Sequence, residues 1–395
     1  MPGSVIVAGA RTPIGKLAGA LGGFSAMELG GFAIKAALER AGVAPEDVDY
    51  VLMGQVLLAG QGQITARQAA VKGGIPLTVP ATTVNKVCLS GLNSIYLADQ
   101  MIAAGDATIV VAGGMESMTN APYLLPGARA GYRMGDQKVI DAMMYDGLFC
   151  AFDVCAMGAG TEKYTKAAGT ISRERQDALA ATSHERAAAA IKDGRFADEI
   201  VPVAVPQRKG DPVIVDTDEG VRPGTTPESL GALKPAFASD GTITAGNASQ
   251  ISDGGAAVIV MSRAEAERRG VTALGEVVGY GQVAGPDPSL LTQPSRATLQ
   301  ALKKAGKSVS DVDLFEFNEA FAAVGLASMD DLGISDDIVN VNGGAIALGH
   351  PIGMSGTRLA LTILHELRRR GGGLGAAALC GGGGQGDALL VRSLA

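Results

Sequence analysis

The sequence predicts an α/β protein made of two similar halves, with a further segment inserted into the first half. Residues 37–50 (ALERAGVAPEDVDY) and 301–314 (ALKKAGKSVSDVDL) match at an offset of 264 residues, and each fits a helix closed by glycine that leads into an apolar strand. Helix patterns also alternate with short apolar runs on both sides of residues 119–249, whereas that segment lacks the alternation. Such alternation favours mostly parallel sheets covered by helices.

The first half starts with a strand. The N-terminal MPGSVIVAGARTPIG has a short apolar stretch and no basic segment, so we expect a strand at 5–8 rather than a signal peptide. A helix is expected after residue 88, because apolar residues recur at helical spacing as far as Gly105, and a strand is expected at 108–112. The run at 256–261 is expected to return to the same sheet.

The insertion and the second half follow. Residues 173–192 predict one long helix, rich in alanine and charge, within the insertion. Strands are expected at 338–341 and 376–379, with a helix to about Arg369 between them. The apolar runs at 108–114 and 376–382 both end in glycines, which supports the repeat. The proposed division is therefore residues 1–118 with about 250–269, the insertion 119–249, and residues 270–395.

Composition excludes several classes of function. The net charge is −7 and the longest basic run is Arg368–Arg370, so binding to nucleic acid is not expected. No apolar run approaches the roughly 18 residues of a membrane helix, so no membrane partner is expected. The cysteines are too far apart for a zinc ribbon and too few for a disulfide scaffold, so we expect no metal and a cytoplasmic location; they are Cys88, Cys150, Cys155 and Cys380.

Cys88 is a candidate nucleophile. It lies in Asn85-Lys-Val-Cys-Leu-Ser-Gly91, between a strand-like segment and the start of a helix. A helix N-terminus lowers the pKa of a nearby thiol, which would activate it. The alternative from this segment alone is a small buried core residue, since free cysteines are often buried.

His350 is the candidate base. It follows a glycine-rich segment, so the backbone can pass close to a ligand while the imidazole faces a cleft. A structural role is equally compatible with this segment alone. The other two histidines, His184 and His365, lie in charged helical stretches and are expected to be solvated.

Cys380 ends an apolar run and precedes Gly381-Gly-Gly-Gly-Gln-Gly386. These glycines formally satisfy G-x-G-x-x-G, but the residues that follow predict a strand rather than a helix that could hold a pyrophosphate. The glycines fit better as backbone N–H donors to a developing oxyanion. The absence of G-x-S-x-G disfavours a serine hydrolase.

Six motifs in order resemble the thiolase family, in particular its biosynthetic acetyl-CoA acetyltransferases. They are NKVCLSG at 85–91, GGMESM at 113–118, AGNAS at 245–249, NEAF at 318–321, GGAIALGHPIGMSG at 343–356 and CGGGGQG at 380–386. The resemblance covers essentially the whole chain. It implies a thiolase fold, in which two βαβ-rich halves form a layered αβαβα arrangement, stacked through central helices, with an inserted loop domain.

The resemblance also implies the chemistry. Cys88, deprotonated by His350, would attack acetyl-CoA and become an acetyl-enzyme, and Cys380 would remove the α-proton of a second acetyl-CoA. The product would be acetoacetyl-CoA, with free CoA released. Asn318 would hold a water that stabilises the enolate oxygen together with His350, while the N–H groups of Cys88 and Gly382 would stabilise the tetrahedral oxyanion. No cofactor is implied, because the CoA thioester is the substrate.

Further implied contacts concern CoA and assembly. Arg222 and Ser229 would meet the nucleotide end of CoA and Ser249 the pantetheine, and the tunnel walls would be Leu148, Met157, Phe237, Ala320 and Phe321. The family forms dimers that often pair through the loop domain, so residues 121–134 predict a homotetramer.

Two departures and two alternatives remain. Ala156 stands where many biosynthetic thiolases have histidine, which puts strict acetyl specificity in doubt, and Phe317 stands where alanine is common. The alternatives are a 3-ketoacyl-CoA thiolase of fatty-acid breakdown and a non-catalytic homologue that binds acyl-CoA or lipid. Retention of both Cys380 and His350 disfavours the second alternative.

Overall fold

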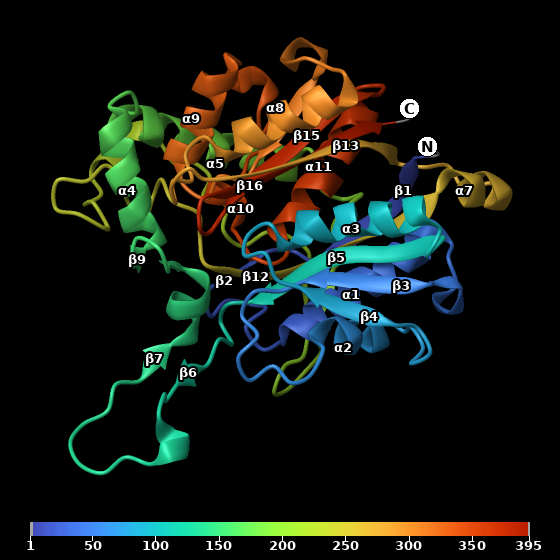
Figure 1. Cartoon of the computed structure of the whole chain (residues 1–395), viewed down its shortest axis with the longest axis horizontal. Coiled ribbons are helices and arrows are strands. Elements are labelled where there is room, and N and C mark those ends of the chain that lie inside the picture. Colours follow the sequence, from blue (N-terminus) through green and yellow to red (C-terminus); the bar gives the residue numbers. More distant parts are fainter. Residues whose placement is uncertain (1–2, 394–395) are drawn as a thin grey trace.

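The computed structural model describes residues 3–393 and contains one large mixed sheet (Figure 1). The strand order is β14-β15-β16-β13-β1-β12-β5-β3-β4, and the short β2 (Gly15–Lys16) pairs with β12. The first half supplies β1 (Ser4–Arg11), β3 (Tyr50–Gly54), β4 (Ala81–Val84), β5 (Ile109–Ser117) and β12 (Ser252–Ser262). The second half supplies β13 (Gly275–Ala284), β14 (Leu314–Phe317), β15 (Gly373–Gly381) and β16 (Gln385–Ser393).

The expectation of mostly parallel sheets was wrong. Parallel pairing occurs at β3–β4, β3–β5 and β14–β15, whereas β1, β12, β13 and β16 pair with their neighbours antiparallel. The reason is connectivity: β15 runs into β16 through a tight turn, and a parallel pair would need a crossover helix there. The predicted return of 256–261 is confirmed, because β12 pairs with both β1 and β5.

The internal repeat is confirmed. Helix α1 (Ala26–Ala41) ends at Gly42 with φ 60° and leads to β3, and α8 (Gln293–Ala305) ends at Gly306 with φ 65° and leads to β14. Strands β5 and β15 start at residues 109 and 373, which is again an offset of 264. The runs at 108–114 and 376–382 thus lie on equivalent strands, but four residues out of register. The strand expected at 338–341 is reduced to a bridge of Val339 with Phe315, which takes the place of β4.

Five layers position the catalytic segments. Helices α3 (Ser90–Ala104) and α11 (Ser355–Arg369) lie between the two halves of the sheet, and Thr357 Oγ1 donates to the carbonyl of Gly91 at 2.9 Å. Helices α1 and α2 (Thr65–Lys72) cover the outer face of the first half. Helices α8 and α9 (Ala322–Leu332) cover the outer face of the second. The layers confirm the αβαβα arrangement.

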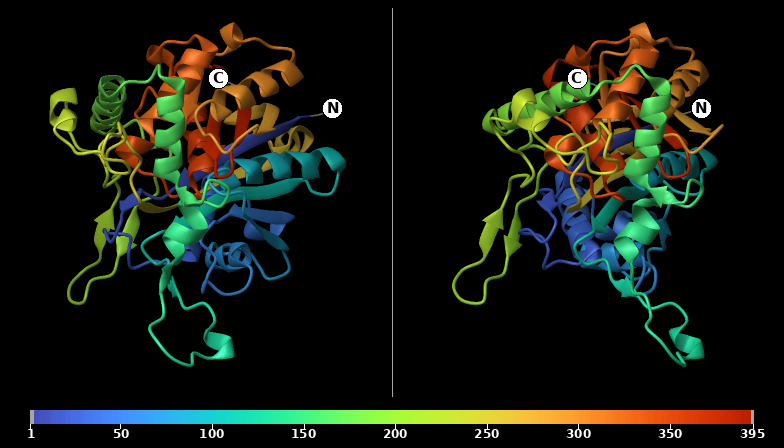
Figure 2. Two further views of the ribbon diagram at one scale, coloured as in Figure 1. Left: turned by 60° about the vertical axis from the view of Figure 1, so that its left-hand side comes forward. Right: turned by 90° about the vertical axis from the view of Figure 1, so that its left-hand side faces the viewer.

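Residues 119–249 form helices and three small hairpins beside the layers. The helices are α4 (Met157–Ala168), α5 (Arg173–Lys192) and α6 (Pro227–Gly231), and α5 has the predicted bounds. The hairpins are β6–β7 (Tyr123–Leu124, Ile140–Asp141), β8–β9 (Phe149–Cys150, Cys155–Ala156) and β10–β11 (Val203–Val205, Val213–Val215). Both β6–β7 and β10–β11 project from the body (Figure 2). Two further short helices, α7 (Arg263–Arg269) and α10 (Ala345–Leu348), lie outside the insertion.

Within residues 3–393, no helix combines the length and apolar character needed to cross a membrane.

Candidate active site

The segment that carries Cys88 is a strained turn between β4 and α3. Val87 has φ 52°, which is rare for a β-branched residue and indicates local strain that the surroundings must hold. Ser90 supplies that hold: its hydroxyl donates to the carbonyl of Val87 at 2.6 Å and accepts from the N–H of Lys86 at 2.8 Å. The turn therefore fixes Cys88 just ahead of α3, as the sequence predicts.

An ion pair ties this turn to the last strand. Lys86 Nζ lies 2.8 and 2.9 Å from the two carboxylate oxygens of Asp387, which also accepts from the hydroxyl of Tyr280 at 2.5 Å. Asp387 follows the hairpin that begins at Cys380, and it pairs with Leu379. The contact thus joins the segments that carry the two cysteines, which are almost three hundred residues apart.

Cys380 lies at the end of β15, beside a turn that requires glycine. Gly383 and Gly384 have φ 78° and 68°, and a Cβ on Gly384 would lie 2.1 Å from the carbonyl oxygen of Asp287. The turn brings the N–H of Gly382 close enough to the Cys88 thiol to oppose the rise of its pKa. An N–H in this position can stabilise negative charge that develops next to Cys88.

His350 is held in one tautomer by Ser355. The Ser355 hydroxyl lies 2.6 Å from His350 Nδ1 and donates to the carbonyl of Pro351 at 2.9 Å. Because the hydroxyl has one proton and the carbonyl can only accept, we assign the ring proton to Nδ1, which donates to Ser355 Oγ. The lone pair of Nε2 then faces the amide of Asn318, whose Nδ2 lies 3.3 Å away.

Two buried glutamates hold the loops around these residues. Glu116 accepts from the N–H groups of Val56, Leu57 and Gly353 at 2.9, 3.1 and 3.0 Å. Glu319 in turn accepts from the side chains of Ser183 and Asn340 and from the N–H of Ile346. Glu116, Glu319 and Ser355 lie in the GGMESM, NEAF and GGAIALGHPIGMSG motifs, but the motifs alone assigned no role to any of the three. A lone carboxylate in an apolar strand, as at Glu116, is the signal that could have indicated one.

The protonation of the site differs from one expectation. Burial raises the pKa of Cys88 to about 12, and the charge of Glu116 adds to that effect, although N–H groups of Cys88 and Gly382 oppose it. The predicted lowering by the helix N-terminus is therefore wrong, because desolvation dominates. Burial also raises the pKa of Cys380, and burial together with the charge of Arg358 lowers the pKa of His350 to about 3. At neutral pH both thiols are protonated and the imidazole is uncharged.

These side chains share one small cavity, which we call the chamber. Its volume is about 50 Å³, and it is lined by Cys88, His350, Cys380, Gly382, Ala320 and Phe321, among others. A larger open cavity of about 630 Å³, which we call the tunnel, shares His350, Met157, Leu148, Ser249 and Phe321 with the chamber. A ligand with a long arm can therefore reach from the surface to the two thiols.

Comparison with known proteins decides the family. Residues 4–264 match the family model described as "Thiolase, N-terminal domain", and residues 271–393 match "Thiolase, C-terminal domain". The chain belongs to the thiolase family. It is 58% identical over 393 residues, the full length of both chains, to a probable acetyl-CoA acetyltransferase of Mycobacterium tuberculosis. It is also 54% and 53% identical to acetyl-CoA acetyltransferases of Cupriavidus necator and Pseudomonas aeruginosa, over 98% of each chain.

Most of the expected CoA contacts of this thiolase lie at the tunnel. Those that line it are Leu148, Met157, Arg222, Phe237, Ser249 and Phe321, whereas Ala320 lines the chamber. Ser229 lines neither; it is exposed and its hydroxyl closes a capping box with Thr226 at the start of α6. Lys16 lines the tunnel but was missed, since β2 is brought there only by pairing with the distant β12.

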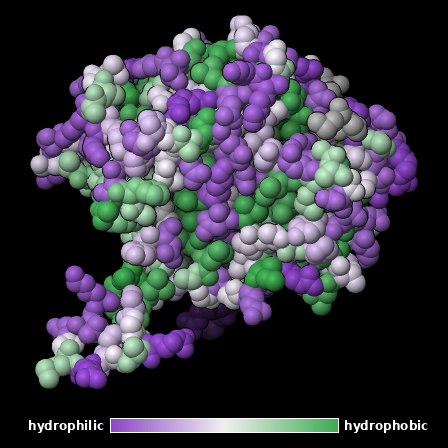
Figure 3. Space-filling view, in the orientation of Figure 1, coloured by the Kyte–Doolittle hydropathy of each residue, from purple (hydrophilic) through white to green (hydrophobic). Residues whose placement is uncertain are grey.

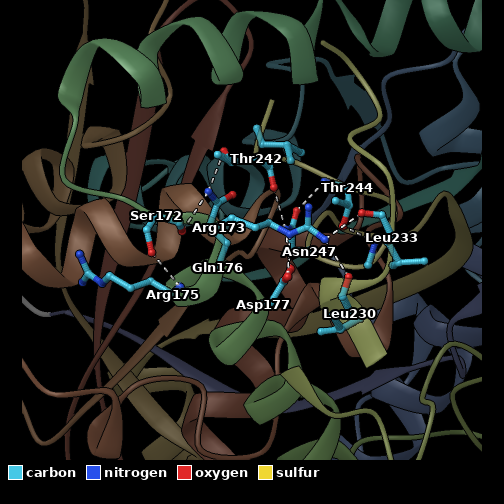
Figure 4. Close-up of polar contacts among 12 residues, drawn as sticks. Ser172, Arg173, Arg175, Gln176, Asp177, Leu230, Leu233, Thr242, Thr244 and Asn247 are labelled. Carbon is cyan, nitrogen blue, oxygen red and sulfur yellow. Dashed lines mark hydrogen bonds and ion pairs between the residues drawn. The ribbon is translucent and has the colours of Figure 1, made fainter. Parts of the chain in front are cut away.

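A polar network holds the tunnel wall at residues 230–247 (Figure 4). Arg173 at the start of α5 donates to the carbonyls of Leu230 and Leu233 at 2.7 and 3.0 Å and pairs with Asp177 at 2.6 Å. Asn247 of the AGNAS motif donates to Asp177 at 2.9 Å. The long helix of the insertion is thereby the support on which this wall of the thiolase tunnel rests.

The two remaining histidines are less exposed than the sequence predicts. His184 is buried, its Nδ1 accepts from the N–H of Arg222 at 3.1 Å, and burial and the charge of Arg222 lower its pKa to about 4. His365 is half-buried, and burial lowers its pKa too. The charged residues around them in sequence misled the prediction, because helices α5 and α11 turn only one face to solvent. His184 thus supports the backbone of a proposed CoA contact.

Proposed function

We propose that this thiolase is an acetyl-CoA acetyltransferase, which joins two acetyl-CoA molecules to acetoacetyl-CoA with release of CoA and also catalyses the reverse reaction. The observation that carries the proposal is the chamber, in which two thiols, a neutral imidazole and the N–H of Gly382 meet at the inner end of the tunnel. The names of the full-length relatives agree with this activity.

The first half-reaction forms an acetyl-enzyme. His350 Nε2 takes the thiol proton as Cys88 Sγ attacks the thioester carbonyl, so the thiolate need not exist beforehand. The oxyanion accepts hydrogen bonds from the N–H groups of Cys88 and Gly382. When the carbon–sulfur bond to CoA breaks, Cys380, which is protonated at rest, gives its proton to the departing sulfur.

The second half-reaction forms the carbon–carbon bond. The Cys380 thiolate left by the first step removes the α-proton of a second acetyl-CoA, and the carbanion attacks the acetyl carbon on Cys88. Cys88 leaves as a thiolate and regains its proton from His350. The Asn318 side-chain oxygen is buried and without a protein partner among the described residues, so it can hold a water at the enolate oxygen.

CoA would lie in the tunnel. We assign Arg222 and Lys16 to its phosphates, Ser249 to the pantetheine, and Phe237 and Phe321 to the walls, where their rings meet edge to face at 6.3 Å. Ser229 lies outside the tunnel lining, so we assign it to the nucleotide end beyond the mouth. We place the enzyme in the cytoplasm, where acetyl-CoA and reduced thiols occur together.

Turnover of acetoacetyl-CoA with CoA tests this function. The purified protein should cleave acetoacetyl-CoA at a higher kcat/KM than straight-chain 3-ketoacyl-CoA of eight or more carbons. A preference for the long chains would identify a 3-ketoacyl-CoA thiolase of fatty-acid breakdown. Binding of acetyl-CoA without turnover would identify a non-catalytic homologue.

We expect Ser355 to determine the tautomer of the base His350. In Ser355→Ala the Nδ1 proton of His350 loses its buried acceptor, so the tautomer with a proton on Nε2 gains population and acyl transfer should slow by about 10- to 100-fold. The protonated imidazole loses the same acceptor, so the pKa of His350 falls further. The acidic limb of the pH–rate profile, where it reports this pKa, then moves to lower pH. Acyl-transfer rates across pH measure both effects.

Two variants complete the Ser355 test. Ser355→Thr keeps the hydroxyl and should restore most of the rate. Ser94→Ala removes a buried hydroxyl of α3 that donates to the carbonyls of Gly91 and Gly113, both at 2.8 Å, and should leave the pH profile unchanged. If Ser94→Ala moves the profile as far as Ser355→Ala does, the effect is general loss of packing.

Ala156 is expected to widen substrate choice. It lines the tunnel together with Leu148 and Met157, and its methyl group leaves more space there than an imidazole would. Each further buried CH₂ of a substrate contributes about 0.8 kcal/mol, so 3-ketoacyl-CoA of five or six carbons or with an α-methyl group should be cleaved at a useful fraction of the acetoacetyl-CoA rate. Ala156→His should suppress these substrates selectively. A uniform loss on every substrate would show that the space does not face the acyl group.

Assembly is expected to be tetrameric. The β6–β7 projection exposes apolar side chains, with Met134 93% and Tyr123 69% exposed, and its surface mixes hydrophobic and hydrophilic residues (Figure 3). Such residues are typical of protein interfaces. Light scattering should give the mass of four chains, and Leu125→Ser with Met134→Ser should lower it. A monomer in solution would refute the homotetramer.

A further inference from the structure

Two cysteines outside the chamber face each other across a hairpin. In β8–β9, Cys150 and Cys155 are directly paired, and the four residues between them form the turn. Directly opposed residues of an antiparallel pair point to the same face, with Cα atoms about 4.5 to 5.5 Å apart. That separation lies within the range of about 4.4 to 6.8 Å that a disulfide spans. Both are free thiols in this structure.

The contacts of the two thiols agree with this placement. Cys150 Sγ accepts from the N–H of Asp153 at 3.4 Å, on the inner side of the turn. A Cβ on Gly160 in α4 would lie 3.6 Å from Cys155 Sγ, so the thiol lies between the hairpin and that helix. Burial and the charge of Asp153 raise the pKa of Cys155, and the charge of Cys150 adds to the effect, as expected of close neighbours.

The hairpin touches the active site at both ends. At its base, Met157 N–H donates to the carbonyl of Leu148 at 2.9 Å, and both side chains line the chamber and the tunnel. At its tip, the ring of Phe152 lies 2.9 Å from where a Cβ of Gly383 would be, next to Gly382. The hairpin therefore links a wall of the chamber to the turn that presents an oxyanion donor.

A small reagent can reach the pair. Cys150 is buried, but it lines an open cavity of about 460 Å³ together with Phe149, Phe152 and Gly383. Cys155 is half-buried. Of the chamber thiols, Cys380 is buried and Cys88 is half-buried. An oxidant of low molecular mass can therefore reach the hairpin pair through Cys155 and through the cavity beside Cys150.

We propose that Cys150 and Cys155 form a reversible disulfide when the enzyme meets a small disulfide oxidant such as oxidised glutathione. One cysteine thiolate attacks the oxidant and releases one thiol, and the second cysteine then displaces the other, so two thiols are produced for each bond formed. The bond closes the turn 151–154 covalently. It holds Leu148, Met157 and Phe152 in fixed positions and so hinders entry of the acyl group into the chamber.

Peptide mapping tests the bond itself. The purified full-length protein is treated with oxidised glutathione at mildly alkaline pH, alkylated without reduction and digested with trypsin. The peptide 139–163 contains both cysteines and no other. It should be lighter by two hydrogen atoms and take up no alkylating reagent, and dithiothreitol should reverse this. Alkylation of both cysteines, or a glutathione adduct on either without closure, would overturn the proposal.

Kinetic measurements test the effect of the disulfide on activity. Only this part of the proposal rests on the proposed function. Oxidation should lower kcat/KM for acetoacetyl-CoA by about threefold or more, because the hairpin can no longer move aside. Cys150→Ser and Cys155→Ser should have the activity of the reduced native chain and should not respond to the oxidant. An equal loss in these variants would place the sensitive thiols in the chamber. If the enzyme turns over no thioester, the peptide map still decides whether the bond forms.

Discussion

Replacing Cys88 with alanine is expected to lower turnover in both directions by about 10⁴- to 10⁶-fold, the range seen when a covalent nucleophile is removed. We expect no other thiol to take its place, because Cys380 faces the chamber from the opposite half, and its sulfur has only its own N–H where the Cys88 sulfur has those of Cys88 and Gly382. Mass spectrometry after brief exposure to acetyl-CoA should place one acetyl group on Cys88 of the native chain and none on Cys88→Ala.

The control for this experiment is Cys150→Ser, which alters a buried thiol outside the chamber and should be acetylated on Cys88 like the native chain. Acetylation of Cys380 instead of Cys88 would reverse the two roles. The acetyl group should also leave Cys88 when CoA is added, since the step is reversible.

Replacing Cys380 with serine is expected to separate the two half-reactions. Only carbon–carbon bond formation needs a base for a carbon acid, so condensation should fall by about 10²- to 10⁴-fold. Acyl transfer should fall much less, because CoA is a good leaving group and gains little from the Cys380 proton. Exchange of labelled CoA into acetyl-CoA measures the first half-reaction, and formation of acetoacetyl-CoA measures both.

The outcome of the exchange experiment assigns Cys380. Retained exchange with lost condensation identifies it as the base. Equal loss of both would mean that Cys380 is needed for packing of β15 or for binding of the first substrate. An unfolding temperature equal to that of the native chain would leave the binding role, and a lower one would indicate the packing role.

Local patterns predicted the elements well. The bounds of α5, the glycine ends of α1 and α8, and the helix after Cys88 all depend on residues a few positions apart, which a sequence displays directly. Strand direction was predicted poorly, since apolar runs do not record it. The pairing of β12 with β1 joins Ser4 to Ser262, and only the folded chain shows that it is antiparallel.

The residues that the sequence assigns to the candidate site lie together in the structure, whereas their ionisation was predicted less well. Cys88, His350, Cys380 and Asn318 do meet. Their ionisation depends on burial, however, and burial reverses the expected effect of a helix N-terminus on the Cys88 thiol. The supporting groups Glu116 and Ser355 act through contacts that only the folded chain shows: Glu116 accepts from the N–H of Gly353, 237 residues along the chain, and Ser355 contacts the imidazole of His350.

The repeat that relates β5 to β15 also relates the residues at the ends of these two strands. At the offset of 264 residues, Cys380 is the counterpart of Glu116, and both occupy the last position but one of their strand. The equivalent corners of the two halves thus carry different groups: a thiol at Cys380 and, at Glu116, a carboxylate that holds the loop before α11. A single unit would carry only one of these specialised corners. The site therefore depends on a difference between two equivalent strand ends, and both halves of the chain contribute to it.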